Sequence, residues 1–323
     1  MKYQRPAPHS KKLSQRSFLR NTLAASMGAA VLRTHLVGAE SGAKGKRIGF
    51  VDDNPSNYHS DVFLKALRGP LQERGFVVAG CTGLKRVEGL AWAQKNSIPY
   101  FDDDKALNEA VDFYMVLAPS TPDTHLELCQ RVLPFGKPTY VDKTFAPNHA
   151  IARDIFALAD RHHTPMQTTS ALRYTNVQAE VRKLAPARVQ HAITWGGGGS
   201  FDEYAIHPLE LLISILGPEA LSLMRRGTGA RSQLLINFSG ERTAVVNVYP
   251  QSNTPFAASL TTEKGTQYHS VDAGPIFINN AAAVLDFFAS GKPNIDRNES
   301  LTIMRCLDAA RDPRALREFI PMA

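Results

Sequence analysis

The sequence predicts an α/β protein in which a doubly wound parallel sheet is followed by a second α/β domain with an open, mainly antiparallel sheet. Two observations predict this order. From residue 46 to 166, short apolar runs alternate with segments of helical periodicity, as in strand–helix–strand units. From residue 167 to 323, apolar runs follow one another across tight turns, as in hairpins. We therefore expect domains at 46–166 and 167–323.

The first domain is expected to repeat strand and helix. Leu64, Leu67 and Leu71 recur at spacings of three and four, which indicates one face of a helix. Thr121 precedes Pro122 and is expected to cap the next helix. Because a helix follows each strand, we expect right-handed crossovers and a parallel sheet buried on both faces. In order, the expected strands are 47–51, 76–80, 111–118 and 139–141, and the helices lie around 64–71, at 122–133 and around 151–158.

The second domain is expected to pair neighbouring strands. Residues 239–241 separate two apolar runs and predict a tight hairpin, and Lys264-Gly265 predicts another. Gly217-Pro218 is a common helix stop and ends a helix that begins near Glu203. The expected strands are 192–195, 233–238, 243–249, 256–262 and 266–271, and the expected helices are 203–216, 276–289 and 299–310.

The charge distribution argues against a nucleic-acid-binding protein. The 323-residue chain has a globular composition, with 43% hydrophobic and 21% charged residues, and a formal net charge of +7. Seven Lys and Arg residues and no Asp or Glu lie in residues 1–39, which leaves 30 basic and 30 acidic residues in the rest. Because binding to phosphates needs a concentrated basic surface, we expect no nucleic-acid partner.

Residues 1–39 have the composition of an export signal. Basic residues at 11–20 precede an apolar run at 23–32, and Val37-Gly38-Ala39 offers small residues for cleavage. The run is shorter than the roughly 20 apolar residues that span a bilayer, so we expect no stable membrane span. Residues 14–20 resemble the twin-arginine signal, with Gln15 at the first arginine position. We expect an exported, periplasmic or extracytoplasmic protein; the alternatives are an uncleaved basic tail and a wrongly assigned start codon.

The cysteines predict neither a disulfide framework nor a metal site. Cys81, Cys129 and Cys306 are widely spaced and form no CxxC or Cys/His pattern. Since Cys81 and Cys129 lie in apolar runs, we expect buried thiols.

The residues best suited to catalysis are Lys143, Glu203, His207 and Glu210. Lys143 follows a predicted strand and should lie at the carboxyl edge of the parallel sheet, where ligands bind in open α/β folds. Glu203 and His207 are four residues apart on a predicted helix, with Glu210 three further on. A carboxylate could orient the histidine to move a hydroxyl proton, while the lysine favours the developing alkoxide. The alternative is a solvated helix face and an exposed lysine.

A second candidate site lies at a predicted strand end and helix start. It contains Ala118, Pro119, Thr121, Pro122 and His125. The N-terminus of a helix offers free N–H groups to a phosphate or ribose. The alternative is a capped strand-to-helix turn on which His125 packs.

At these motifs the chain resembles the glucose-fructose oxidoreductase, inositol dehydrogenase and MocA family (Gfo/Idh/MocA). The resemblance implies a Rossmann domain, NAD or NADP as cofactor, and sugar or polyol substrates. It implies that Lys143 positions the substrate, that His207 is the catalytic acid/base, and that Arg173 and Tyr204 lie beside the substrate. The matching segments are 120–125 with "TP…H", 136–144 with "GKHVxxEKP", 172–174 with an arginine-containing segment and 203–210 with "DxGxHxxD".

The first turn departs from the glycine-rich pattern of that family. Asp52 and Asn54 stand at probable glycine positions, where a Cβ and a carboxylate oppose a pyrophosphate. Lys85 and Arg86 follow the second strand and would suit the 2′-phosphate of NADP; a solvated basic pair is the alternative. The residues expected to contact the cofactor are Gly49, Asp52, Asn54, Thr82, Lys85, Arg86, Ala118, Pro119, Thr121, Pro122, His125 and Lys143.

The predicted function is an exported NAD(P)-dependent oxidoreductase that transfers hydride between the nicotinamide and a sugar- or polyol-like alcohol. One alternative is an enzyme that uses bound NAD transiently to cleave glycosidic bonds. The other is a non-catalytic Rossmann-fold carbohydrate-binding protein that has lost the nucleotide, because fold alone does not decide function. An open sheet with one uncovered face also favours a homo-oligomer, either a dimer or a tetramer.

Overall fold

The computed structural model describes residues 45–184 and 189–322. The expected export signal at 1–39 lies outside these residues. Within the described ranges, no helix is both long and apolar enough to cross a bilayer.

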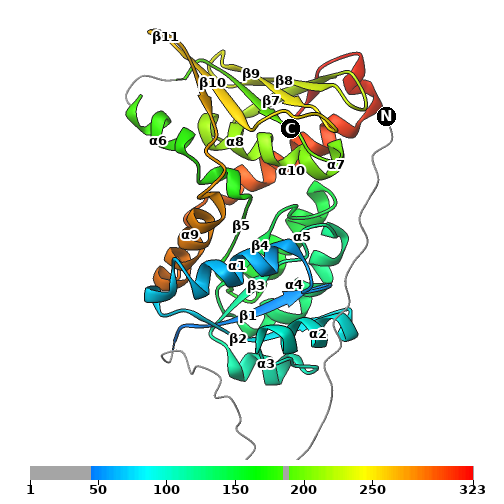
Figure 1. The fold of residues 1–323 in the computed structure, drawn as a ribbon. Helices are drawn as coiled ribbons and strands as arrows, with labels where there is room; N and C mark the ends of the chain where they lie inside the picture. The colour runs from blue at the N-terminus through cyan, green and yellow to red at the C-terminus, as the bar shows by residue number, and fades with distance from the viewer. Residues whose placement is uncertain (1–44, 185–188, 323) are drawn as a thin grey trace, which may run out of the picture. The chain divides into compact units, whose positions relative to one another are not determined.

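A five-stranded parallel sheet runs in the order β2-β1-β3-β4-β5 (Figure 1). Since β1 lies between β2 and β3, the chain winds outward from β1 first in one direction and then in the other. Ligands in open α/β sheets bind beside the carboxyl ends of the strands at this reversal. The strands are β1 (Arg47–Asp52), β2 (Val77–Gly83), β3 (Phe113–Val116), β4 (Thr139–Asp142) and β5 (Met166–Thr169).

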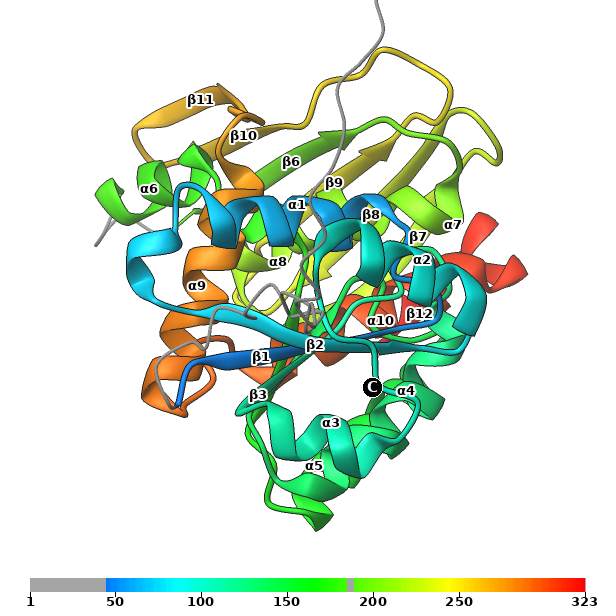
Figure 2. The same ribbon diagram turned by 60° about the horizontal axis from the view of Figure 1, so that its bottom comes forward.

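Helices cover both faces of this sheet because successive side chains of a strand point to opposite faces. Ile48 and Phe50 share a buried cluster with residues of α1, α2 and α9, whereas Val51 and Val116 share one with residues of α3, α4 and α5. Figure 2 shows α1 and α9 on one side of the sheet and α3 and α5 on the other. The helices are α1 (Tyr58–Arg68), α2 (Arg86–Asn96), α3 (Asp104–Ala110), α4 (His125–Val132), α5 (His149–Arg161) and α9 (Ile276–Ser290).

A seven-stranded mixed sheet follows in the order β11-β10-β6-β9-β8-β7-β12. Within this sheet, as far as its strands are described, β6 and β9 pair in parallel and every other pair is antiparallel. The strands are β6 (His191–Gly196), β7 (Ala220–Arg226), β8 (Ser232–Phe238), β9 (Thr243–Val248), β10 (Ala257–Thr262), β11 (Gly265–Ser270) and β12 (Ile320–Pro321), and the remaining helices are α6 (Asn176–Lys183), α7 (Phe201–Tyr204), α8 (Ile206–Leu216) and α10 (Arg297–Arg311).

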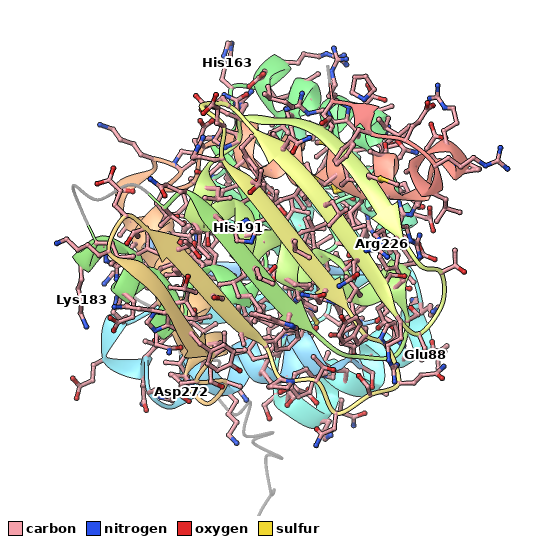
Figure 3. The ribbon with its side chains drawn as sticks, turned by 90° about the horizontal axis from the view of Figure 1, so that it is seen from above. Glu88, His163, Lys183, His191, Arg226 and Asp272 are labelled. Atoms are coloured by element: carbon pink, nitrogen blue, oxygen red, sulfur yellow. The ribbon has the colours of Figure 1, made fainter. Side chains whose placement is uncertain are left out.

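Helices α8 and α10 pack on one face of the second sheet. Figure 3 looks onto the other face, where His191 and Arg226 are labelled on strands that no helix crosses. The inner face is apolar, since alternate residues of β8 such as Leu234 and Ile236 are buried. The sheet is therefore covered on one side and open on the other.

The predicted fold class is confirmed, with corrections to single elements. The expected helix 122–133 begins as a short 3₁₀ segment, Pro122–Thr124, and Thr121 makes no side-chain cap, so that expectation is wrong. The expected helix 203–216 is divided into α7 and α8 at Ala205. Helices α2, α3 and α6 and strands β5, β7 and β12 were not among the expected elements.

Candidate functional site

The turn between β1 and α1 is held together by its own side chains. Asp52 has no exposed surface, and its carboxylate accepts hydrogen bonds from Asn54 N (3.1 Å), Asn57 Nδ2 (2.8 Å) and Ser60 Oγ (3.0 Å). Burial raises the pKa of Asp52 to about 7, while the hydrogen bonds act in the opposite direction. A carboxyl group thus occupies the place where the resemblance implies a glycine.

The backbone donors of this turn are also used internally. Asn57 Oδ1 accepts from His59 N at 2.9 Å and from Ser60 N at 3.0 Å, which caps the N-terminus of α1. Asn54 Oδ1 accepts from Ser56 N at 3.0 Å. These are the N–H groups that a helix start would otherwise offer to an anion.

The residues of this turn therefore do not fit the diphosphate of a dinucleotide bound at the start of α1. The N–H groups of His59 and Ser60 already donate to Asn57, the buried Asp52 side chain occupies the turn, and the carboxylate of Asp53 opposes an anion. A nicotinamide nucleotide would have to be held by other contacts.

The basic pair expected to hold a 2′-phosphate is already paired. Lys85 Nζ lies 3.3 Å from Asp53 Oδ2. Arg86 donates to both carboxylate oxygens of Asp102, at 2.6 and 2.8 Å. Both cations are exposed, but each already has a carboxylate partner. The structure therefore gives no specific support for NADP over NAD.

Gly49 and Thr82, both expected to contact the cofactor, lie within strands of the sheet and contact other residues of the protein. Gly49 is in the middle of β1, where a Cβ would come within 3.2 Å of Val111. Thr82 is 1% exposed, and its Oγ1 accepts from Arg131 at 3.0 Å. The need for close packing explains this glycine without a cofactor.

His125 is also a packing residue in this structure. It is fully buried, and its ring nitrogens lie 2.9 Å from the carbonyl oxygens of Phe145 and Leu117. Of the same segment, Ala118 and Pro119 are buried at the end of β3, while Thr121 and Pro122 are half-buried. The alternative of a strand-to-helix turn on which His125 packs describes this segment.

Lys143 and His207 are brought to the carboxyl edge of the parallel sheet. Lys143 directly follows β4, is 7% exposed and donates from Nζ to Pro119 O at 3.2 Å. His207, at the start of α8, has its Nδ1 2.8 Å from Ser170 Oγ, one residue beyond β5. Burial lowers the pKa of His207 to about 3, the charges of Lys143 and His59 act in the same direction, and Asp142 opposes them. The imidazole is therefore neutral near pH 7.

The expectation that Glu203 or Glu210 orients His207 is not what the structure shows. Glu203 is exposed and separated from His207 by the break between α7 and α8. Glu210 is buried and accepts from Arg173 Nε at 2.5 Å and from Thr169 Oγ1 at 3.0 Å. The hydroxyl group of Ser170 orients the His207 ring instead.

Arg173, expected beside the substrate, is engaged in a buried ion-pair network. Its guanidinium contacts Glu210 on α8 and Glu299 on α10. Burial opposes its charge, but the two carboxylates more than offset this, so the pKa of Arg173 is raised. Tyr204 does lie beside the site, because its ring centroid is 5.6 Å from that of His207.

Three residues of the site were missed by sequence reasoning: Ser170, Asp142 and His59. Asp142 Oδ2 lies 2.5 Å from His59 Nδ1. Asp142 ends β4, which was expected, and directly precedes Lys143. Ser170 follows the unexpected strand β5, so a prediction of β5 would have placed it at a strand end. No pattern in the sequence pointed to His59.

The described part of the chain has cavities both at this edge and away from it. One, of about 10 Å³, lies between Lys143, Thr168, Thr169 and Glu210 and has room for one water molecule. A larger one, of about 260 Å³, is lined by His149, Arg305 and Asp308 and contains none of the predicted site residues. No cluster of His, Cys, Asp and Glu in 45–184 or 189–322 is arranged to hold a metal ion.

The fold is similar to solved dehydrogenase and oxidoreductase structures over most of the chain. GenD2 from gentamicin A biosynthesis, in complex with NAD, has a TM-score of 0.72 and 15% identity; the match covers 86% of this chain and 97% of GenD2. Myo-inositol dehydrogenase from Lactobacillus casei, in complex with NAD(H) and myo-inositol, has a TM-score of 0.72 and 12% identity, covering 85% and 96%.

An oxidoreductase from Agrobacterium radiobacter, in complex with NAD⁺, L-tartaric acid and magnesium, has a TM-score of 0.69 and 13% identity, covering 86% of this chain and 98% of that one. No protein-family profile and no curated sequence matches the chain. The resemblance to Gfo/Idh/MocA-type dehydrogenases is thus confirmed at the level of the fold.

Proposed function

We propose that this chain is an oxidoreductase that acts on a hydroxyl-bearing carbon of a sugar- or polyol-like molecule. The observation that carries the proposal is the placement of Lys143 and His207 at one sheet edge, each held by a single hydrogen bond. Oxidation of such a carbon needs a hydride acceptor, and NAD or NADP is the one that the resemblance implies. Because the β1–α1 turn is closed, we expect either nucleotide to be held weakly, as a dissociable co-substrate.

The side chains of the site supply the proton chemistry. The ammonium of Lys143 would donate to the substrate oxygen and stabilise its developing negative charge. Neutral His207 would exchange the hydroxyl proton at Nε2. Since the Ser170 hydroxyl can donate or accept, it can partner either tautomer of His207, so the ring could pass from proton acceptor to donor without moving.

Turnover measured in single variants tests these roles. We expect His207→Gln and Lys143→Met to lower kcat/KM by at least about 100-fold, because each removes a group that acts on the reacting oxygen. The assay follows absorbance at 340 nm with millimolar NAD or NADP over a panel of sugars and polyols. His163→Asn is the control, since His163 is exposed after α5 and lies at the periphery in Figure 3. Normal turnover in either site variant would refute its role.

A second candidate is a carbohydrate-binding protein without a nucleotide, which the closed turn favours. Sugar binding in calorimetry, together with no nucleotide binding at millimolar concentration, would support it. Sugar release without net change at 340 nm would instead support the NAD-dependent glycosidase alternative.

We also propose that residues 1–39 direct export. The basic stretch, apolar run and small residues support this. Cell fractionation with N-terminal sequencing should find a mature chain, beginning near residue 40, outside the cytoplasm. A full-length chain in the cytoplasm would contradict export.

A further inference from the structure

A second histidine, His59, lies at the same edge of the parallel sheet. It occupies the first turn of α1, and its Nδ1 is 2.5 Å from Asp142 Oδ2. Asp142 ends β4 and is 1% exposed, and the His59 side chain is 12% exposed. The pair therefore joins the start of α1 to the end of a strand two positions away from β1 in the sheet.

Asp142 is fixed by a second contact. Its Oδ1 accepts a hydrogen bond from Tyr140 Oη at 3.0 Å. Tyr140 Oη in turn accepts a hydrogen bond from Asn280 Nδ2 at 3.3 Å. Burial opposes the charge of Asp142, but His59 and Lys143 offset it and hold the pKa of this carboxyl below its usual value. The carboxylate is thus ionised near pH 7 and oriented on both oxygens.

The closed turn positions His59 from its other side. Asn57 accepts from the backbone N–H of His59, and Asn57 is itself held by Asp52. The hydrogen bonds of the turn therefore also hold the backbone of His59 in place.

The anchors of the two histidines are neighbours. Asp142, which holds His59, pairs with Thr169 in the β4–β5 register, and Ser170, which holds His207, is the next residue. Adjacent strands lie about 4.8 Å apart. Each ring uses Nδ1 for its anchor, and neither Nε2 makes a hydrogen bond to the described residues.

We propose that His59 is a second substrate-contacting residue, held by Asp142 as His207 is held by Ser170. The substrate class that fits two such rings beside Lys143 is a polyol or sugar with two neighbouring hydroxyl groups, one for each Nε2. His207 exchanges the proton of the reacting hydroxyl, and His59 hydrogen-bonds to the second one. This inference rests on the proposed function and narrows its substrate class.

Chemical modification with protection tests this without depending on turnover. Diethyl pyrocarbonate acylates free imidazole nitrogens, and peptide mass spectrometry reports the rate at each histidine. With 100 mM myo-inositol as the probe, we expect the rates at His59 and His207 to fall together by roughly fivefold or more, while exposed His163 reacts unchanged. Protection of His207 alone would overturn the role of His59. Protection of neither would overturn the polyol substrate class and, with it, this inference.

Kinetics of matched variants supply a second readout. We expect His59→Gln and Asp142→Asn each to lower kcat roughly tenfold or more on vicinal polyols, with a smaller loss on a substrate that lacks the second hydroxyl. A purely structural role would lower turnover equally on both substrates and would contradict the proposal. Circular dichroism melting checks that both variants fold.

Discussion

Asp52 organises the hydrogen bonds of the turn between β1 and α1. Its carboxylate, buried after β1, accepts hydrogen bonds from Asn54, Asn57 and Ser60 and so draws the turn around itself. A glycine at this position would leave that space and those donors to a ligand. Together with Asn54 and Asn57, which accept from the backbone N–H groups of the turn, Asp52 leaves the turn with its donors satisfied internally.

The titration of Asp52 predicts a pH dependence of stability. Its pKa of about 7 in the folded protein lies above the unfolded value of about 3.9, so between these pH values the folded state binds more protons. Its contribution to the free energy of unfolding is therefore present below about pH 4 and is lost as the pH rises to about 7. We expect wild type to lose about 2 kcal/mol more than Asp52→Asn between pH 5 and pH 8 in urea unfolding. Equal losses in both proteins would contradict the assignment.

The placement of Lys143 and His207 at the sheet edge could be predicted from the sequence, but their hydrogen-bond partners could not. Lys143 was found because it follows an apolar strand, and His207 because it lies within a helical pattern. Glu203 was assigned as a partner from its spacing, but the break at Ala205 removes the shared helix face. Ser170 was missed because hydrogen-bond partners across elements leave no local pattern.

At the scale of elements, Arg173 connects the end of the parallel sheet to the second domain. It follows β5 and contacts carboxylates on α8 and α10, so three segments meet at one guanidinium. Such a contact explains why this arginine is present without invoking a substrate.

Removing this guanidinium should destabilise the fold. We expect Arg173→Met to lower the free energy of unfolding by about 3 kcal/mol, because it leaves two buried or half-buried carboxylates without their partner. Arg297→Met is the matched control, since Arg297 and Asp160 are both about half exposed and such pairs contribute at most about 1 kcal/mol. Urea unfolding of both variants measures the difference. A small loss in Arg173→Met, with a large rise in KM, would favour its predicted role beside the substrate.

The elements that the sequence predicted are those with a clear apolar pattern. Strand β5 was missed because Gln167, Thr168 and Thr169 are buried although they are polar. Hydrogen bonds to other elements, such as that from Thr169 to Glu210, help to satisfy such side chains and leave no local sequence pattern. Helix α2 was missed because its buried residues, Gly89, Trp92 and Ala93, form a narrow stripe on an otherwise exposed helix.

For the whole molecule, a fold similar to that of solved dehydrogenases is combined with a closed first turn. The doubly wound sheet was predictable because its strands are apolar and alternate with helices. The mixed second sheet was predictable only in part, since the parallel contact of β6 and β9 joins strands far apart in sequence. Its open face, on which Tyr268 is 61% exposed, agrees with the expected dimer or tetramer, which stays a prediction.

Calorimetric titration of NAD and NADP into wild type and into Asp52→Gly/Asn54→Gly/Asn57→Gly tests the central claim most directly. If side chains of the turn occupy the place of the diphosphate, the glycine variant should bind a nucleotide at least tenfold more tightly than wild type, and wild type should purify without stoichiometric nucleotide. Circular dichroism verifies that the variant is folded, and Asn57→Gly alone replaces it if it is not. Tight binding by wild type, equal to or stronger than that of the variant, would contradict the closed turn.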